Sequence, residues 1–422
     1  MKKVLSIILS LSILLTLMAG CGSSSSTQSG STNSASSGSS EGKVTIRFSS
    51  WDSADSFEQQ KKLVDNFNKT HSNIQVNFEG YGDQYDTKIS AAIGAGDAPD
   101  VMYMWNYPKY SEALEPLDSY IQKEGSYYKS NFYDTLWNYN SMDGKILGLP
   151  IGYTSFVLYY NKDLFDKAKV AYPTDSWTWD DVQAAAKKLT DKGSKVYGYE
   201  VPEKPDPYDY EMFLWSNGTS YTDGNSTVQG YLNSDKAVQS FSVMQNMLKN
   251  GTAVPVTSSN YGEAEFKSGK AAMFITGSWS VDTLKKAKVN FGVSLLPRYS
   301  ASQKSVSVVD ASGIAISKTS KNKDAAWEFA KYWTSEELNK ARIGYELPVL
   351  KSVAKSQNVA SDPIYSKFYT MLEQSSSYSP TLLKYKNWSD LSDNLSQAFE
   401  QMFNPSTYKN PKDALNDVAN NS

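Results

Sequence analysis

The body of the chain, from residue 43 onward, alternates between two hydrophobic periodicities. Apolar side chains occupy every second position in 44–48 and 74–78, a continuous apolar run occurs in 101–104, and the segment 155–161 is rich in residues that favour strands. These segments are typical of strands. Apolar residues three and four positions apart instead predict helices, with stripes in the segments 57–67, 182–189, 241–248, 326–333 and 391–402. Strands separated by helices favour largely parallel sheets covered by helices, so the pattern predicts an α/β fold.

The first 42 residues follow a different pattern. Lys2 and Lys3 precede an apolar run that ends in Met18-Ala-Gly-Cys21. A positive start, a short apolar core and a small-residue exit predict a secretory signal peptide over 1–21, too short for an ordinary membrane-spanning helix. Residues 22–42 contain eleven Ser and four Gly and no large apolar side chain. Such a segment buries too little surface to offset its ordering entropy, which predicts a flexible linker.

The composition excludes several kinds of site. Cys21 and His71 are the only residues of their types, so an intramolecular disulfide and zinc sites built from several Cys or His ligands are impossible. A Ser-His-Asp or Cys-His mechanism would depend on His71, which lies in a polar turn and is expected at the surface. Nucleotide-binding and metalloprotease motifs are absent, and the acidic cluster at 206–211 is interpreted as solvated loop charges. We therefore expect no cofactor and no metal.

Charge gives little reason to expect a nucleic-acid partner. The chain has 42 basic and 45 acidic residues, a formal net charge of −3. A protein that binds nucleic acid through its phosphates would need a basic surface instead.

Aromatic residues stand where several apolar patterns end. Next to Asp, Asn, Thr or Ser we find the following loop aromatics: Trp51 beside Asp52, Trp105 beside Asn106, Tyr153, Trp279 and Trp388. In open α/β sheets, ligands bind at the carboxyl ends of strands, where such loops gather. An aromatic ring packs on the C–H face of a sugar while its polar neighbours pair with the hydroxyls. The sequence thus predicts a sugar-binding cleft.

Two resemblances extend this interpretation. The ending Met18-Ala-Gly-Cys21 resembles the lipobox of bacterial lipoproteins, which implies a lipid such as palmitate on Cys21. Five patterns, in order, resemble the extracellular sugar-binding proteins of ABC importers, the group that includes maltose-binding protein: Val44–Trp51; Ala95–Val101; Gly144–Pro150 with Leu158–Asp163; Phe266–Trp279 with Asn290–Pro297; and Gly313–Ser317 with Ala325–Ala330.

The second resemblance implies a two-lobed periplasmic-binding-protein-like (type II) fold with a hinge and a cleft between the lobes. Crossovers are expected near 151–155, 290–297 and 313–318. The N-terminal lobe would comprise 43–152 plus about 297–317. The C-terminal lobe would comprise 153–296 plus about 318–415, and 416–422 would be a tail.

The resemblance also implies a role and a binding site. The chain would be a lipid-anchored, extracytoplasmic component of an ABC transporter, on a cell surface of the Gram-positive type. It would capture a sugar by hinge closure and deliver it to the permease subunits, as a monomer without enzymatic activity. With the loop positions above, the expected ligand-binding residues are Trp51, Asp52, Trp105, Asn106, Tyr153, Tyr208, Trp279, Asp310 and Trp388.

Two alternatives remain open at this point. A pair of carboxylates could make the chain a secreted carbohydrate-active enzyme, a glycosidase. A surface sugar sensor or adhesin would use the same aromatic and acidic side chains.

Overall fold

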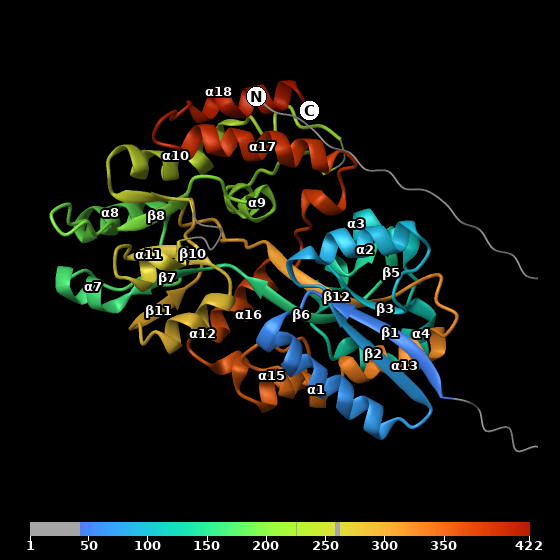
Figure 1. Cartoon of the computed structure of the whole chain (residues 1–422). Coiled ribbons are helices and arrows are strands. Elements are labelled where there is room, and N and C mark those ends of the chain that lie inside the picture. The colour runs from blue at the N-terminus through green and yellow to red at the C-terminus, as the bar shows by residue number, and fades with distance from the viewer. Residues whose placement is uncertain (1–42, 225, 258–261) are drawn as a thin grey trace, which may run out of the picture. The chain divides into compact units, whose positions relative to one another are not determined.

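The computed structural model describes residues 43–224, 226–257 and 262–422 (Figure 1). The predicted signal peptide, Cys21 and the linker 22–42 lie outside these residues. Those from Lys43 to Ser422 group together as one unit by their contacts. No helix in the described part of the chain has the length and apolar character needed to cross a membrane.

The first sheet has five strands in the order β2-β1-β3-β12-β6. Its strands are β1 (Val44–Ser50), β2 (Ile74–Gly80), β3 (Val101–Met104), β6 (Leu149–Ser155) and β12 (Val309–Ile316). β1 pairs in parallel with β2 and β3, whereas β12 pairs antiparallel with β3 and β6. The strands predicted over 44–48, 74–78 and 101–104 are confirmed, and because they are parallel their carboxyl ends share one edge.

Helices cover this sheet through aromatic contacts. Phe48 of β1 is fully buried, and its ring lies 5.0 Å from those of Phe329 and Trp333. These two rings belong to α13 (Lys323–Trp333), while α1 (Ala54–Thr70) adds the buried Val64 and Phe67. Such rings bury large apolar areas, which provide the main stabilisation of the sheet.

The second sheet has three strands in the order β10-β7-β11 and is entirely antiparallel. It consists of β7 (Val157–Asn161), β10 (Met273–Thr276) and β11 (Phe291–Ser294). Two smaller sheets pair β8 (Tyr199–Pro202) with β9 (Ala253–Val256) and β4 (Ser141–Met142) with β5 (Lys145–Ile146). The prediction of largely parallel sheets thus holds for the β1–β3 region and is wrong for this second sheet.

The predicted helices are found, with defined ends. α8 (Trp179–Leu189) begins where Thr178 and Asp181 bond reciprocally: each side chain accepts from the other residue's backbone N–H, at 3.3 and 2.8 Å. This is a capping box. The other long helices are α2 (Tyr85–Gly94), α9 (Pro207–Ser216), α10 (Asp235–Lys249), α16 (Tyr365–Gln374), α17 (Trp388–Phe403) and α18 (Pro411–Asn420).

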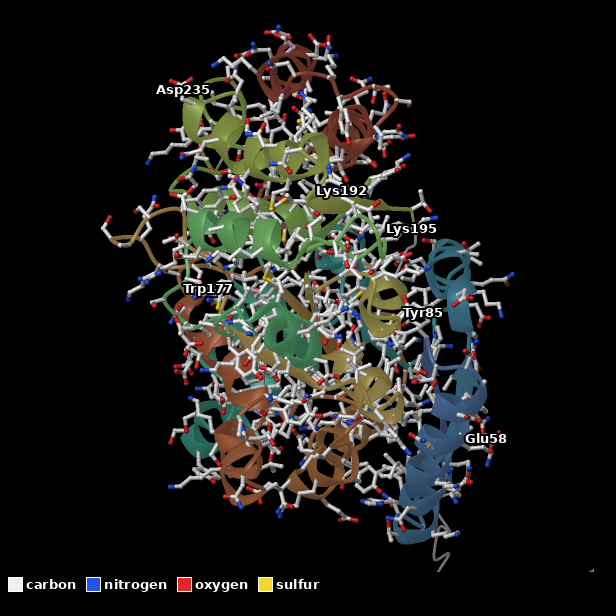
Figure 2. The ribbon with its side chains drawn as sticks, turned by 90° about the vertical axis from the view of Figure 1, so that its left-hand side faces the viewer. Glu58, Tyr85, Trp177, Lys192, Lys195 and Asp235 are labelled. Atoms are coloured by element: carbon white, nitrogen blue, oxygen red, sulfur yellow. The ribbon has the colours of Figure 1, made fainter. Side chains whose placement is uncertain are left out.

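Shorter helices complete the unit. They are α3 (Tyr107–Tyr110), α4 (Asp118–Lys123), α5 (Ser126–Ser130), α6 (Asp134–Tyr139), α7 (Lys162–Ala168), α11 (Glu263–Lys267), α12 (Trp279–Lys286), α14 (Glu336–Ala341) and α15 (Lys351–Ser356), with 3-10 turns at Gly82–Gln84, Ser111–Ala113, Val359–Ser361 and Thr381–Leu383. Charged side chains such as Glu58 and Lys192 point outward (Figure 2).

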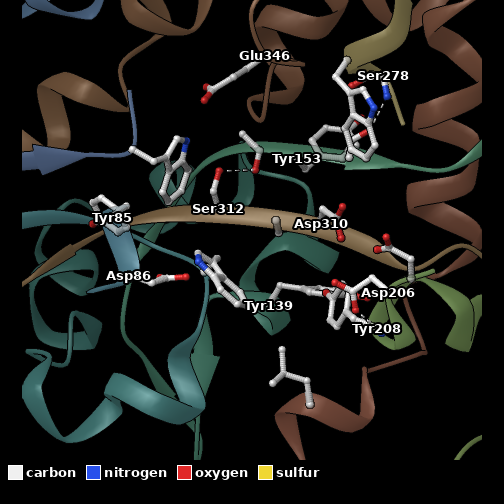
Figure 3. A pocket seen from close by; sticks show the side chains of 18 of the residues that line it. Tyr85, Asp86, Tyr139, Tyr153, Asp206, Tyr208, Ser278, Asp310, Ser312 and Glu346 are labelled. Atoms are coloured by element: carbon white, nitrogen blue, oxygen red, sulfur yellow. Dashed lines mark hydrogen bonds between the residues drawn. The ribbon is translucent and has the colours of Figure 1, made fainter. Parts of the chain in front are cut away.

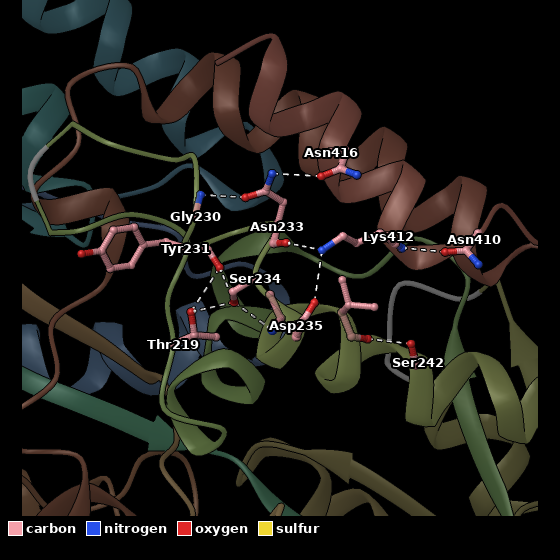
Figure 4. A network of polar contacts seen from close by, with 12 residues as sticks. Thr219, Gly230, Tyr231, Asn233, Ser234, Asp235, Ser242, Asn410, Lys412 and Asn416 are labelled. Carbon is pink, nitrogen blue, oxygen red and sulfur yellow. Dashed lines mark hydrogen bonds and ion pairs between the residues drawn. The ribbon is translucent and has the colours of Figure 1, made fainter.

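Polar contacts fasten the last helix to the start of α10 (Figure 4). Lys412 Nζ donates to the Asn233 carbonyl at 3.1 Å and pairs with Asp235 at 3.2 Å. Asn233 Nδ2 donates to Asn416 Oδ1 at 2.9 Å. Val418 and Ala419 of the same helix are buried. The predicted tail 416–422 is therefore mostly helix, because its apolar side chains have a surface to cover.

The chain passes between the two sheets at points close to those expected. β6 of the first sheet leads into β7 of the second through Phe156 alone, and residues 295–308 lead back from β11 to β12. Gly313–Ile316 pair with β3, so the third expected crossover lies inside the first sheet. After residue 318 the chain contributes to both parts: α13 packs on β12 and β1 of the first sheet, whereas α17 and α18 contact α9 and α10. The remaining lobe boundaries stay predictions.

Candidate functional site

A cavity of 980 Å³ lies at the carboxyl ends of the parallel strands (Figure 3). β12 and β6 run across its floor, and the first turns of α9, α12 and α17 contribute to its wall. Because β1, β2 and β3 are parallel, the residues that follow them arrive at the same edge. The expectation of a cleft where strand-end loops gather is confirmed.

Seven of the nine predicted ligand-binding residues line this cavity: Trp51, Trp105, Tyr153, Tyr208, Trp279, Asp310 and Trp388. The other lining residues are Gly82, Asp83, Tyr85, Asp86, Tyr139, Gly152, Thr154, Asp206, Asp209, Ser278, Ala311, Ser312, Tyr345, Glu346, Leu382, Leu383 and Ser392. The structure thus brings together residues up to about 340 positions apart, while their contacts with a ligand stay predictions.

Asp52 and Asn106 do not line the cavity. Asp52 is 2% exposed, and its carboxylate accepts hydrogen bonds from Ser50 Oγ at 2.7 Å and from the Tyr345 hydroxyl. Tyr345 thus stands at the cavity wall where Asp52 was expected. Asn106 caps α3 instead, accepting from the Lys109 N–H at 3.3 Å.

Three aromatic side chains keep an open face. Trp105, Trp279 and Tyr345 are 42%, 44% and 40% exposed, although Trp and Tyr side chains are largely buried on average. The Trp279 ring stands edge-on to Phe156 at 5.6 Å and folds back over Gly277, where a Cβ would lie 2.4 Å from it. Any side chain at 277 would push the ring away, so glycine at this position sets its orientation.

The floor connects the two sides of the cavity. Thr154 of β6 lies opposite Asp310 of β12 in the antiparallel pair. Thr154 Oγ1 accepts a hydrogen bond from the Ser278 N–H at 2.7 Å, which attaches the start of α12 to the crossover strand. The turn that carries Trp279 is therefore held by the floor itself.

Two carboxylates, Asp310 and Asp206, stand near each other above this floor. Burial, and then the charge of Asp206, raise the pKa of Asp310 to about 7. Asp206 caps α9, accepting from the Tyr208 N–H at 2.9 Å, and desolvation raises its pKa too. The Tyr208 hydroxyl donates to the Val309 carbonyl at 2.9 Å.

Glu346 is a lining carboxylate that was not predicted. Its carboxylate lies over Gly152, where a Cβ would be 2.8 Å from Glu346 Cδ, and it pairs with Arg342 Nε at 3.2 Å. Burial raises the pKa of Glu346 to about 7, against the opposing effect of Arg342. Its segment, Gly344-Tyr-Glu-Leu-Pro348, has the same pattern as the predicted loop residues: an aromatic residue beside an acidic one, flanked by the turn-forming residues Gly and Pro.

In the acidic cluster at 206–211, Asp206 is exposed as expected, but the other two carboxylates are not solvated loop charges. Asp209 and Glu211 are buried on α9. Glu211 accepts hydrogen bonds from the Thr381 N–H, at 2.8 Å, and from the Thr381 hydroxyl. Burial raises the pKa of Glu211 to about 7, with the Thr381 bonds opposing it. The interpretation was wrong for Asp209 and Glu211 because they belong to a helix that is covered almost all round.

Two further observations limit the chemistry. His71 is half-buried at the end of α1, its ring stacked on Phe67 at 3.9 Å, and does not line the cavity. Across the described parts of the chain, no three His, Cys, Asp or Glu side chains gather in a way that could hold a metal ion. The cavity offers ring faces, hydroxyls and carboxylates.

The comparisons with known proteins agree with this geometry. Residues 62–367 match the family model described as bacterial extracellular solute-binding protein. A binding protein of Brucella abortus is 28% identical over 364 residues, 82% of this chain and 84% of the relative. The galactooligosaccharide-binding protein of Bacillus subtilis is 27% identical over 320 residues, 72% of this chain and 73% of the relative.

A solved structure shows the same fold. The ABC substrate-binding protein of Listeria monocytogenes in complex with cycloalternan is similar with a TM-score of 0.77 and 29% sequence identity. The match covers 90% of this chain and 98% of that chain. The predicted two-lobed α/β fold is confirmed.

Proposed function

The chain belongs to the bacterial extracellular solute-binding proteins, and from this we propose that it is the oligosaccharide-binding component of an ABC importer. The observation that carries the proposal is the cavity wall, where the open faces of Trp105, Trp279 and Tyr345 alternate with carboxylates and hydroxyls. Ring faces pack against the C–H groups of a sugar, and the polar groups between them accept from its hydroxyls.

The size of the cavity favours an oligosaccharide over a single sugar. Its 980 Å³ stands at the upper end of the range for small-ligand pockets, about 300–1,000 Å³. Aromatic side chains stand at several points around it, so a ligand that fills it meets several rings. The relatives that bind a galactooligosaccharide and cycloalternan support the same class of ligand.

Binding would act through closure about the floor strands. Trp105 follows β3 of the first sheet, whereas Trp279 begins α12 beside the second. A sugar that contacts both sides stabilises the closed form by its differential affinity for the two forms. The closed, loaded shape is what the permease would recognise, and the protein would work as a monomer.

A thermal-shift panel of oligosaccharides, followed by calorimetry, tests this function. We expect at least one neutral oligosaccharide to raise the melting temperature and to bind with micromolar or tighter affinity, about −8 kcal/mol or better. Stabilisation by a peptide or a polyamine, but by no oligosaccharide, would contradict the proposal.

A second experiment, with an oligosaccharide that the panel shows to bind, separates the binding protein from a glycosidase. The bound oligosaccharide is incubated with the protein for a long period and then analysed by chromatography. We expect it to remain intact, because the chain would bind without chemistry. Product formation would instead favour the carbohydrate-active enzyme.

The lipid anchor is a second part of the proposal and rests on the ending Met18-Ala-Gly-Cys21. With Cys21→Ala in the full chain, we expect the protein to leave the membrane fraction while its sugar affinity stays unchanged. A variant that still fractionates with membranes would contradict lipid attachment at Cys21.

A further inference from the structure

The cavity wall carries charge of one sign only. Its carboxylates are those of Asp83, Asp86, Asp206, Asp209, Asp310 and Glu346. Among the described residues that line it there is no Lys, Arg or His. A ligand that enters this cavity therefore meets acceptors and negative charge, and no cationic side chain of the wall.

The guanidinium beside the cavity does not change this. Arg342 is 3% exposed. Its Nη1 donates to the Trp333 carbonyl at 3.1 Å and Nη2 to the Ile151 carbonyl at 3.0 Å, while Nε lies 3.2 Å from a carboxylate oxygen of Glu346. With its donors directed at protein oxygens, Arg342 has no group to offer a carboxylate or phosphate of a ligand.

Two of these carboxylates, those of Asp206 and Asp310, stand near each other. Asp206 caps the start of α9 in the wall and Asp310 belongs to β12 in the floor, and the two side chains lie close together in Figure 3. Asp206 is close enough to Asp310 for its charge to act on the Asp310 carboxyl. Two carboxylates at this separation repel each other, so a positive charge or a hydroxyl donor between them is favourable.

The surroundings of the pair point to a ligand. The rings of Tyr139 and Tyr208 stand beside it. The Tyr139 hydroxyl is buried, on a residue 4% exposed, and faces the Val309 carbonyl without making a well-aligned hydrogen bond to it. The nearby Val309 carbonyl already accepts from Tyr208. A buried hydroxyl without a well-aligned partner is costly, and a ligand oxygen at the pair would give it one.

We propose that Asp206 and Asp310 make the cavity select saccharides according to the charge of the saccharide. Uncharged saccharides bind through hydroxyls that donate to the pair. Saccharides that carry a carboxylate or a phosphate are excluded, because their charge faces carboxylates with no cation to balance it. A saccharide with a protonated amine at this position binds at least as tightly as the uncharged one. This inference rests on the proposed function.

The physical reasons differ for the three classes. An anion would have to lose its hydration next to like charges, which suppresses binding by orders of magnitude. A protonated amine donates to both carboxylates at once, in charge-assisted hydrogen bonds that are stronger than those of a hydroxyl. The neighbouring tyrosine rings add cation–π attraction for the amine.

The test uses one sugar skeleton in three charge states. Maltotriose, β-1,4-galactotriose, mannotriose and the tightest neutral binder of the oligosaccharide panel are each prepared unmodified, oxidised at C6 to the uronate, and converted at C6 to the amine. Calorimetry at pH 8 measures each dissociation constant. We expect the uronate form of every skeleton that binds to be about 100-fold weaker than its neutral form, and the amine form to be equal or tighter.

The variant that tests the residues is Asp206→Asn with Asp310→Asn, which keeps the shape of both side chains. We expect the penalty for the uronate to shrink at least about tenfold and the preference for the amine to be lost. The matched control is Asp143→Asn with Asp180→Asn, which removes the same charge from exposed residues outside the cavity wall. It should keep the ranking of the parent protein.

The outcomes separate this inference from the proposed function. Uronate and neutral forms that bind within threefold of each other overturn the inference and leave the function standing. The inference is also overturned if the double Asn variant, with an unchanged melting temperature, keeps the full ranking. A protein that binds no neutral oligosaccharide of the panel contradicts the proposed function itself.

Discussion

Tyr345 donates a hydrogen bond to Asp52, although the two residues are 293 positions apart. The bond attaches the loop after α14 to the carboxyl end of β1. We expect Tyr345→Phe to lower the free energy of unfolding by about 1.5–3 kcal/mol, because the buried carboxylate loses a donor. Its sugar dissociation constant should change less than threefold, since the ring remains. Urea denaturation and calorimetry measure the two effects.

Tyr345→Ala separates the ring from the hydroxyl. This variant should lose the same stability and bind sugar more weakly as well. If Tyr345→Phe weakened binding as much as Tyr345→Ala, the hydroxyl itself would contact the ligand and its bond to Asp52 would not be its main role.

Trp279→Ala removes the most exposed tryptophan face of the cavity. We expect binding to weaken by about 1–3 kcal/mol, the contribution of covering an aromatic face, with little change in stability because the ring is 44% exposed in the free protein. Calorimetry measures the dissociation constant. The control is Tyr231→Ala, a ring of similar exposure, 40%, that does not line the cavity. An unchanged affinity in folded Trp279→Ala would remove this ring from the site.

The stability of the ligand-free protein should depend on pH through Asp310. Its pKa is raised to about 7, whereas an unfolded Asp titrates near 4. Between these values the folded state holds a proton that the unfolded state has released, so stability falls as pH rises from about 4 to about 7. The Asp310→Asn variant lacks this titrating carboxyl group, so its own stability does not fall for this reason. Its melting temperature relative to the parent protein should therefore rise between pH 5 and pH 8.

Asp180→Asn is the control for that measurement, because Asp180 is exposed on α8. Its melting temperature relative to the parent should not change over the same range. A flat difference for Asp310→Asn as well would mean that Asp310 titrates as an ordinary surface carboxylate.

Glu346→Gln tests the buried ion pair at the cavity wall. Arg342 would keep its two carbonyl acceptors but lose the carboxylate, and we expect a loss of roughly 3 kcal/mol of unfolding free energy. Asp65→Asn breaks the exposed pair with Lys61 and should cost less than about 1 kcal/mol. Equal losses for the two variants, measured by urea denaturation, would contradict this account.

Local patterns in the sequence predict most of the elements that build the cavity. Trp51 and Trp105 are found because each directly follows a strand whose alternation or apolar run is plain, and the parallel pairing then brings both to one edge. Trp388 is found because it begins a helix with a clear apolar stripe. These residues depend on periodicity and chain order, which a single sequence contains.

What the sequence could not supply depends on contacts between distant segments. From its local sequence Asp52 is expected to accept hydrogen bonds from a ligand, but in the fold it accepts one from Tyr345. The residues around Asp52 and Tyr345 in the sequence do not predict this contact. Glu211 looks solvated until Thr381 is found to donate to it. The antiparallel second sheet was missed for a similar reason, because β7 pairs with β10 and β11, which follow it by more than a hundred residues.

The strand β1 has seven residues, about 23 Å of extended chain. Its carboxyl end reaches the cavity at Trp51, so its amino end, next to residue 43, lies at the opposite edge of the first sheet. A protein held from its N-terminal side would therefore be attached through one lobe only, at the end of β1 that points away from the cavity. The other lobe would stay free to swing, and the attachment would not compete with closure.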